Sequence, residues 1–293
     1  MRIGLLGTGP WASLVHAPAL AAHPDIEFAG VWGRRPEAAD TLAAAHGVPA
    51  YKAVDDLLAD VDAVAIALPP DVQAEYAVRA AAAGKHLLLD KPVAATVDAA
   101  RAVEDAAAAA GVASVVFFTV RFAGTQGDWI AEQAERGGWF TAHCHWIGSV
   151  FTTDSPYAAS PWRQQKGALW DVGPHALSVL LPVLGDVERV AAAPGPGDTA
   201  HLILRHAGGA SSTVTLSLTA PPEASALGAG AELRGTAGVT RLPDRDTPPT
   251  AAYGRALDAL LAAAATGTPH PCDVRFGRRV VEVLAQAEEQ LLR

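Results

Sequence analysis

The segment GALWDVGPHAL, residues 167–177, is mostly apolar, yet it contains a carboxylate and an imidazole four residues apart, Asp171 and His175. On one helix this spacing places both side chains on the same face. Pro174 restricts such a helix to a start close to the motif, because proline lacks the N–H that an interior helical residue donates. Buried ionisable groups are costly unless they are paired or used in chemistry. The segment is therefore either a hydrogen-bonded core pair or part of a proton-transfer site.

A lysine at the end of an apolar run is the second group suited to chemistry. Lys91 lies in LLLDKPVA, residues 87–94, after a run typical of a buried parallel strand. Ligands of such sheets bind outside the carboxyl ends of the strands, and Pro92 keeps Lys91 out of a helical conformation. There the amine would lower the pKa of a substrate hydroxyl or stabilise a developing oxyanion. In isolation, the same residues also fit an exposed lysine before a proline turn.

The N-terminus contains a phosphate-binding pattern. Residues 7–12, GTGPWA, form a G-x-G-x-x-A turn between an apolar strand, RIGLL, and a helix expected over residues 11–22. The first glycine permits a tight turn, the second lets the backbone approach a pyrophosphate, and the alanine lets helix and strand pack closely. The helix N-terminus adds free N–H groups and the positive end of its dipole. We therefore expect a dinucleotide to contact Gly7, Thr8, Gly9, Pro10, Trp11 and Ala12.

The residues after the second expected strand indicate which dinucleotide is favoured. That strand, IEFAGVW, is followed by Gly33, Arg34 and Arg35, with no carboxylate to bind the ribose 2′-hydroxyl of NAD. An arginine at this position accommodates the 2′-phosphate of NADP. We expect NADP to be preferred over NAD, with Arg34 as the phosphate contact and Arg35 as the alternative. Two arginines at the start of a solvated helix are the competing interpretation.

The elements that must position these groups alternate between strands and helices over the first 120 residues. Apolar runs indicate buried strands, and the helices between them end at Gly47, Gly84 and Gly111. This alternation predicts an α/β fold with a doubly wound parallel sheet covered on both faces. The expected strands are RIGLLG, IEFAGVW, VDAVAIALPP, HLLLD and SVVFFTV, and the expected helices are 11–22, 36–46, 71–83 and 96–110.

After residue 120 the pattern changes to longer strands with more alternation, WFTAHCHWIG, HLILRH, STVTLSLT and AELRG. Such strands predict a largely antiparallel sheet with one covered face. Residues 155–167 are predicted to form a long polar loop. We expect two domains, a dinucleotide-binding domain over residues 1–120 and a second α/β domain over residues 121–293. The helices expected in the second part are 128–136, 169–184, 251–265 and 274–292.

Composition narrows the range of partners. The chain has 293 residues, of which 50% are hydrophobic and 18% charged, as in an ordinary globular protein with a substantial core. A formal net charge of −9 argues against nucleic acid and anionic membranes as partners. No segment is predicted to be a signal peptide or a transmembrane helix. With only two cysteines, Cys144 and Cys272, we expect a cytoplasmic protein without a disulfide framework.

One short stretch raises the question of a metal. His143-Cys144-His145 would place two imidazoles on one face of a strand, as in the beginning of a zinc site. No further ligands occur at a suitable spacing. We therefore predict sheet surface there and expect no metal.

Taken in order, four motifs resemble those of the Gfo/Idh/MocA oxidoreductases, the family of glucose–fructose oxidoreductase and inositol dehydrogenase. The motifs are the G-x-G-x-x-A turn, AIALPP, AGKHLLLDKPVA and GALWDVGPHAL. The last two are specific as a pair, whereas the first is shared by all Rossmann domains. The resemblance covers nearly the whole chain. It implies an N-terminal Rossmann domain, a C-terminal α/β domain for substrate binding and oligomerisation with an open sheet, and a site between them.

The resemblance also implies roles for individual residues. The family's Glu-Lys-Pro corresponds to residues 90–92, and its D-x-G-x-H motif corresponds to residues 171–175. In the family the lysine and the histidine are catalytic, and the aspartate helps to hold the substrate. The catalytic residues implied here are Lys91, His175 and Asp171, and the cofactor contacts implied beyond the N-terminal turn are Leu68, Pro69, Asp90, Lys91 and Pro92.

Two residues depart from the family pattern. Asp90 is one methylene shorter than the usual glutamate, and Gln73 stands where many members carry a histidine that contributes on the cofactor side. Three further residues are expected near the substrate. The resemblance places Arg121 at a hinge close to the cofactor, while Trp162 and Arg163 form either a wall and a polar contact for a hydroxylated substrate or the anchor of a surface loop.

We therefore expect an NAD(P)-dependent dehydrogenase or reductase that transfers a hydride between nicotinamide and a secondary alcohol of a sugar, inositol or related polyol. His175 would take the hydroxyl proton, Lys91 would polarise the reacting oxygen, and Asp171 would bind a neighbouring hydroxyl. Whether Lys91 or His175 is the immediate base stays open. The alternatives are a dinucleotide-binding sensor without turnover and a glycosidase with tightly held NAD. The open sheet face implies a homodimer or homotetramer.

Overall fold

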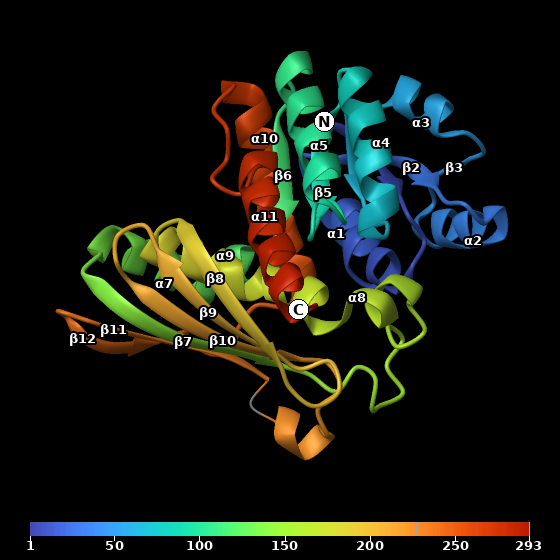
Figure 1. The fold of residues 1–293 in the computed structure, drawn as a ribbon. Helices are drawn as coiled ribbons and strands as arrows, with labels where there is room; N and C mark the ends of the chain where they lie inside the picture. The colour runs from blue at the N-terminus through green and yellow to red at the C-terminus, as the bar shows by residue number, and fades with distance from the viewer. Residues whose placement is uncertain (227, 293) are drawn as a thin grey trace. The chain divides into compact units, whose positions relative to one another are not determined.

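The computed structural model describes residues 1–226 and 228–292 (Figure 1). They form two compact units. The first comprises Met1–Phe122 and Pro248–Val281, and the second comprises Ala123–Thr247 and the residues from Glu282 onward. The expected second domain began at residue 121 and ran to the end of the chain. The compact units differ from that expectation, because Pro248–Val281 packs with the first unit, where helix α10 (Pro249–Thr266) contacts the strands at one edge of the sheet.

The first unit contains a six-stranded parallel sheet in the order β3-β2-β1-β4-β5-β6, which confirms the predicted parallel architecture (Figure 1). The direction of strand order reverses between β1 and β4, and ligands of such sheets bind at the carboxyl ends beside that reversal. The strands are β1 (Arg2–Leu6), β2 (Glu27–Trp32), β3 (Ala50–Tyr51), β4 (Ala63–Ile66), β5 (His86–Asp90) and β6 (Ser114–Phe117).

Helices cover both faces of this sheet, as the apolar strands predicted. Helices α4 and α5 lie side by side over β4 and β5, while α10 packs against α1 and contacts β5 and β6 (Figure 1). Gly47 and Gly111, at φ of 66° and 64°, end α2 and α5 in the left-handed conformation. The other helices are α1 (Ala17–Ala22), α2 (Pro36–His46), α3 (Val54–Asp60), α4 (Pro70–Ala82), α5 (Val97–Ala110) and α6 (Thr119–Phe122).

The helix predicted over residues 11–22 is divided in two. Ala12–His16, labelled η1, form a π-helical turn in which the N–H of Ala17 bonds to the carbonyl of Ala12, five residues earlier. Pro18, in the first turn of α1, has no N–H for an α-helical bond to the residue four positions before it. A π turn accommodates one extra residue at such a break. The consequence is that His16 turns fully into the core.

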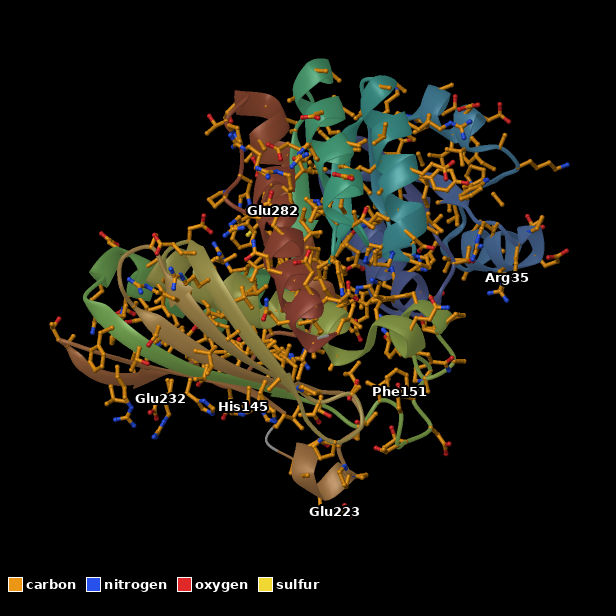
Figure 2. All side chains as sticks on the ribbon, in the orientation of Figure 1. Arg35, His145, Phe151, Glu223, Glu232 and Glu282 are labelled. Carbon is orange, nitrogen blue, oxygen red and sulfur yellow. The ribbon has the colours of Figure 1, made fainter. Side chains whose placement is uncertain are left out.

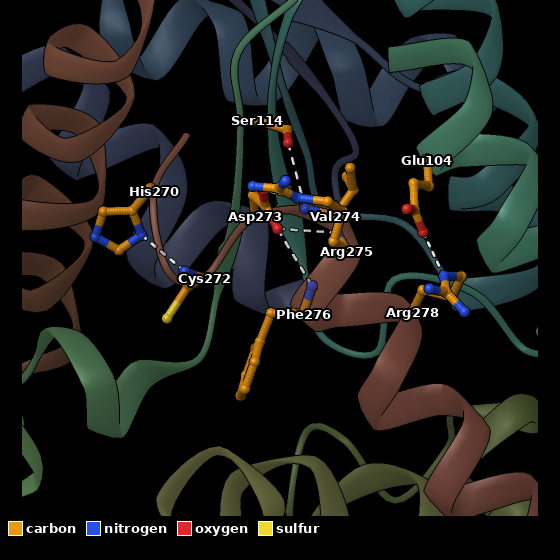
Figure 3. Close-up of polar contacts among 9 residues, drawn as sticks. All are labelled: Glu104, Ser114, His270, Cys272, Asp273, Val274, Arg275, Phe276 and Arg278. Atoms are coloured by element: carbon orange, nitrogen blue, oxygen red, sulfur yellow. Dashed lines mark hydrogen bonds and ion pairs between the residues drawn. The ribbon is translucent and has the colours of Figure 1, made fainter. Parts of the chain in front are cut away.

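Helix α11 (Val274–Leu291) begins in the first unit, where polar contacts hold its N-terminus. Asp273 caps the helix, because its Oδ1 accepts the N–H of Phe276 at 3.2 Å (Figure 3). The N–H of Val274 donates to Ser114 Oγ at 3.3 Å, which joins the helix to β6.

The second unit contains a mixed sheet in the order β12-β11-β7-β10-β9-β8, in which only the β7–β10 pair is parallel. This confirms the predicted, largely antiparallel sheet. Helix α9 packs on β7 and β10, and His145 and Glu232 project from the open side (Figure 2). The elements are α7 (Gly124–Arg136), β7 (Trp139–Ile147), α8 (Pro161–Asp171), α9 (Gly173–Leu184), β8 (Val187–Pro194), β9 (Ala200–His206), β10 (Ser211–Ser217), η2 (Pro222–Ser225), β11 (Ala229–Gly235) and β12 (Gly238–Arg241).

The segment Pro161–Leu184 differs from two expectations. Its first part is helical from Pro161, where a polar loop was predicted, since proline suits the first turn of a helix. The segment also has the length and the mean hydropathy, 1.3, of a membrane-spanning helix, although no such segment was predicted. Its apolar window is 78% buried inside the protein, as in a core helix, and Gly167 interrupts the helix at φ 59° and ψ −161°.

Candidate functional site

The phosphate-binding turn follows β1, next to the reversal of strand order. Gly7 adopts a φ of 132°, and its N–H donates to the carbonyl of Trp32 at 2.8 Å. A Cβ on Gly7 would lie 2.4 Å from the carbonyl oxygen of Ala67, whereas a Cβ on Gly9 would meet no atom of the described chain within 4 Å. The fold thus requires glycine at position 7 but not at position 9. Open space at Gly9 is what the close approach of a pyrophosphate needs, so the turn fits a dinucleotide.

The end of β2 is closed to an acidic side chain. A Cβ on Gly33 would lie 2.6 Å from Cγ2 of Thr8, so Thr8 occupies the space in which a carboxylate at this position would begin. Arg34 and Arg35 follow and are exposed, and Arg35 projects away from α2 (Figure 2). The side chains available to a ribose at this strand end are therefore cationic, as the sequence indicated.

Asp90 ends β5, Lys91 and Pro92 follow it, and a buried glutamine of α4 holds this turn. Gln73 Nε2 lies 2.8 Å from the carbonyl oxygen of Asp90 and 3.1 Å from that of Pro92. Its Oε1 accepts the N–H of Asp90 at 2.9 Å. Gln73 stands where many family members carry a histidine that contributes on the cofactor side. In the structure its side chain is 1% exposed and contacts the backbone around Lys91.

The predicted cofactor residues of the first unit gather at one edge of the sheet. The Gly7–Ala12 turn follows β1, Leu68 and Pro69 follow β4, and Lys91 follows β5, three strands that are neighbours in the sheet. Arg121 lies beyond β6, in α6, where its guanidinium is 5.8 Å from the ring centre of Phe276. The topology thus unites positions that are more than 80 residues apart in sequence.

In the second unit, Asp171 is buried in an ion pair. The Nε of Arg163 lies 2.9 Å from Asp171 Oδ2, and the guanidinium is 5.0 Å and 4.7 Å from the ring centres of Tyr157 and Trp162. Aromatic rings beside a guanidinium restrict its motion and stabilise its charge. Arg163 thus holds the Asp171 carboxylate, and Trp162 lies against the guanidinium of Arg163.

His175 stands in the first turn of α9, and its ring stacks on that of Trp146 from β7, with centroids 5.4 Å apart and planes 18° apart. Pro174 occupies the first turn, as predicted. The expectation that Asp171 and His175 share one helix is wrong, because Asp171 is the last residue of α8 and Val172 separates the two helices. Pro174 cannot donate the N–H that would continue α8 through the motif.

A second carboxylate, Asp198, braces the segment that leads to Asp171. It lies in the connection between β8 and β9, where its Oδ2 accepts the N–H of Ala168 at 3.0 Å. Its Oδ1 accepts the N–H of Leu218 at 2.9 Å and the hydroxyl of Thr219 at 2.8 Å. Charge-assisted hydrogen bonds of this kind are strong, so Asp198 joins the start of the motif to the end of β10. No sequence pattern singled out Asp198.

Two further features, the histidines of β7 and a cavity in the first unit, are not part of the predicted site. In β7, His143 and His145 alternate with Cys144, which burial keeps protonated by raising its thiol pKa to about 12. No cluster of three or more His, Cys, Asp or Glu side chains suited to a metal occurs in residues 1–226 and 228–292.

A cavity of about 280 Å³, lined in part by His86, Ser114 and Asp273, lies at the amino ends of β5 and β6, opposite the edge that carries Lys91.

Comparisons with known proteins agree with this layout. Residues 1–118 match the profile of the oxidoreductase family with an NAD-binding Rossmann fold, and residues 142–241 match that of the GFO/IDH/MocA C-terminal domain. The first range holds the Gly7–Ala12 turn and Lys91, and the second holds Asp171 and His175.

Relatives extend the comparison. An uncharacterized protein of Saccharomyces cerevisiae is 28% identical over 210 residues, 66% of this chain and 58% of its own length. D-xylose 1-dehydrogenase (NADP(+)) 2 of Haloferax volcanii is 32% identical over 203 residues, 65% of this chain and 59% of its own length. The chain thus spans less than two thirds of the length of these curated relatives. The WlbA dehydrogenase from Bordetella pertussis, solved with NADH and UDP-GlcNAcA, has the same fold, with a TM-score of 0.85 and 22% identity over 99% of this chain and 95% of that one.

The two matched profiles occur in the order that the motifs predicted, and each falls on the predicted fold. They show that this chain belongs to the Gfo/Idh/MocA family of oxidoreductases.

Proposed function

We propose that the protein is an NAD(P)-dependent dehydrogenase or reductase acting on a secondary alcohol or ketone of a sugar or polyol. One observation carries this proposal: the Gly7–Ala12 turn and Lys91 lie at the same edge of one sheet, with only β4 between their strands. Neighbouring strands are spaced at about 4.8 Å, so about 10 Å separates the two strand ends. A dinucleotide with its pyrophosphate at the turn and its adenosine toward Arg34 would extend its nicotinamide toward β4 and β5.

The bound dinucleotide would supply the hydride acceptor or donor, while the protein supplies binding and proton transfer. In the oxidative direction, the Lys91 amine polarises the reacting oxygen and His175 removes the hydroxyl proton. Asp171, held by Arg163, accepts a hydrogen bond from a neighbouring hydroxyl.

A carbohydrate substrate is supported by the names of the relatives and by the chemistry of the second unit. The Haloferax relative is named for D-xylose, and the Bordetella structure contains a nucleotide sugar. Beside His175, Trp146 provides an apolar ring face, and Asp171 provides a hydrogen-bond acceptor. This combination of one apolar wall and few polar groups is typical of small-molecule sites.

Spectrophotometry with a panel of substrates tests the proposal. Purified protein is mixed with NAD⁺ or NADP⁺ and, in turn, with pentoses, hexoses, inositols and nucleotide sugars, and the appearance of reduced nicotinamide is recorded. We expect reduction with at least one of them. Nucleotide binding without any reduction would favour the sensor, and cofactor retained through purification with sugar cleavage but no net reduction would favour the glycosidase.

The preference for NADP rests on Arg34 and has its own test. We expect Arg34→Ala to weaken NADPH binding by about tenfold or more, the loss of one charge-assisted phosphate contact, and to leave NADH affinity nearly unchanged. Arg35→Ala is the matched control, with a smaller effect on NADPH. Titration of the intrinsic tryptophan fluorescence measures both affinities. Wild-type protein that binds NADH as tightly as NADPH would contradict the assignment.

We also propose that the protein is cytoplasmic and that it self-associates. The open side of the second sheet carries the large apolar side chain of Ile203, which is 59% exposed, between the polar side chains of His201 and Arg205. A homodimer or homotetramer would use this face.

A further inference from the structure

Three buried polar side chains lie beneath the Asp90–Lys91–Pro92 turn, and the proposed reaction does not use them. Gln73, His16 and Tyr253 come from α4, η1 and α10, and each is at most 1% exposed. Burying polar groups is costly unless each finds partners. A core built for stability alone would place apolar side chains here. Their presence under the predicted catalytic lysine therefore calls for an explanation from function.

The contacts of Gln73 include the backbone on both sides of Lys91. Its amide group meets the N–H and the carbonyl of Asp90 before the lysine and the carbonyl of Pro92 after it. A third carbonyl, of Val93, lies 3.3 Å from Nε2. Because a buried amide with this many partners cannot rotate freely, the path of the turn is fixed relative to α4.

His16 acts on the same turn through the side chain of Asp90. Its Nε2 lies 3.3 Å from Asp90 Oδ2, and Asp90 Oδ1 accepts the N–H of Lys91 at 2.8 Å. The carboxylate thus bridges the imidazole and the backbone of the lysine. This distance places the imidazole in direct contact with the carboxylate, although the ring orientation does not give a hydrogen bond.

Aromatic packing fixes the His16 ring. Its centroid lies 4.2 Å from that of Tyr253 and 6.4 Å from that of Phe117, which it meets edge-on. Burial, and after it the charge of Asp90, raises the pKa of Tyr253 well above 10, so the phenol stays neutral. Among the described residues, no hydrogen-bond partner reaches the Tyr253 hydroxyl. The imidazole is therefore confined beside the carboxylate.

We propose that Gln73 and His16 are positioning residues for Lys91, Gln73 through the backbone of the turn and His16 through the Asp90 carboxylate. This inference rests on the proposed function. It also gives a reason for aspartate at position 90, because the short side chain returns its carboxylate to its own turn and to His16. The pair Gln73 and His16 thereby determines where the nicotinamide end of the dinucleotide meets the protein.

Comparing two ligands separates positioning from general stability. The first is the reduced dinucleotide that the wild-type protein binds more tightly, and the second is its counterpart without nicotinamide, 2′-phospho-ADP-ribose for NADPH or ADP-ribose for NADH. In the proposed binding mode both would contact the Gly7–Ala12 turn, but only the first would reach β5. Isothermal titration calorimetry measures both affinities in the full chain, so no knowledge of the sugar substrate is needed.

The variants keep size and packing while removing polar atoms. We expect Gln73→Met and His16→Phe each to weaken binding of the reduced dinucleotide by about tenfold and binding of its truncated counterpart by less than about twofold. His16→Gln, which retains an N–H donor near the position of Nε2, should restore most of the lost affinity. Gln126→Met is the matched control, because Gln126 is a buried glutamine of the second unit bonded to the carbonyl of Pro243, and neither affinity should change.

The outcomes distinguish this inference from the function on which it rests. Equal weakening of both ligands, or no weakening of either, would overturn the positioning roles while leaving the dinucleotide site in place. Failure of His16→Gln to restore affinity would overturn the role of the His16–Asp90 contact. Wild-type protein that binds neither ligand would overturn the proposed function, and the inference with it.

Discussion

Lys91→Met and His175→Ala are each expected to lower kcat for hydride transfer by about 10²- to 10⁴-fold, the contribution typical of a positioned acid–base group. In the proposed reaction both act on the same oxygen, so the double variant should lose much less than the product of the single losses. Methionine keeps the apolar stem of Lys91, and the turn stays fastened by Gln73 and Asp90. Dinucleotide affinity should therefore remain close to that of the wild-type protein. Initial rates and titrations on the same preparations measure both quantities.

An exposed lysine provides the control for this experiment. Lys52→Met alters a lysine on the surface of the first unit and should leave kcat unchanged. The pH–rate profiles of the two variants then test His175 as the base, since the limb that belongs to the base should disappear in His175→Ala and persist in Lys91→Met. Turnover at a wild-type rate in either Lys91→Met or His175→Ala would show that the assigned roles are wrong.

The two glycines of the phosphate turn should respond to alanine in opposite ways. Gly9→Ala places its Cβ in open space, so stability should change by less than about 0.5 kcal/mol while dinucleotide affinity falls by about tenfold or more. Gly7→Ala forces a Cβ against the Ala67 carbonyl at a φ of 132° and should lower the free energy of unfolding by about 2–4 kcal/mol. Denaturant unfolding and fluorescence titration record the two effects separately.

Gly47→Ala is the reference for the cost of φ alone. Gly47 has a φ of 66° but no atom of the described chain within 4 Å of its Cβ position, so its cost should be about 1 kcal/mol. A Gly9→Ala protein that binds the dinucleotide like the wild-type protein would contradict the position assigned to the pyrophosphate.

Local patterns sufficed for most of the first unit's fold. Apolar runs with glycines and prolines at their ends located five strands and the helices η1–α1, α2, α4 and α5, because both signals arise within a few residues of sequence. The short helix α3 (Val54–Asp60) was missed. The β3 strand was missed because it has only two residues and forms the edge of the sheet. The π turn was missed because Pro18 lies late in a segment whose composition is otherwise helical.

Less of the candidate site could be predicted, since the residues that hold the Lys91 turn are identified only by tertiary contacts. Motifs identified Lys91, Asp171 and His175 themselves. Gln73 contacts a turn 17 residues away, and His16 lies beside a carboxylate of another strand. Such side chains look like ordinary helical residues until the fold places them. The division of Asp171 and His175 between two helices likewise depends on how Pro174 is accommodated, which spacing alone does not determine.

Transfer of deuterium from the nicotinamide to a carbohydrate is the sharpest test of the proposed hydride transfer. The protein is incubated with NADPH or NADH deuterated at C4 of the nicotinamide, together with ketone forms of sugars and inositols, and mass spectrometry follows the label. We expect deuterium to leave the nucleotide and to appear on a carbinol carbon of a carbohydrate, and we expect Lys91→Met and His175→Ala to slow this transfer by about 10²- to 10⁴-fold. A wild-type protein that binds the nucleotide but transfers no deuterium to any carbohydrate, even reversibly, would contradict the proposed hydride transfer.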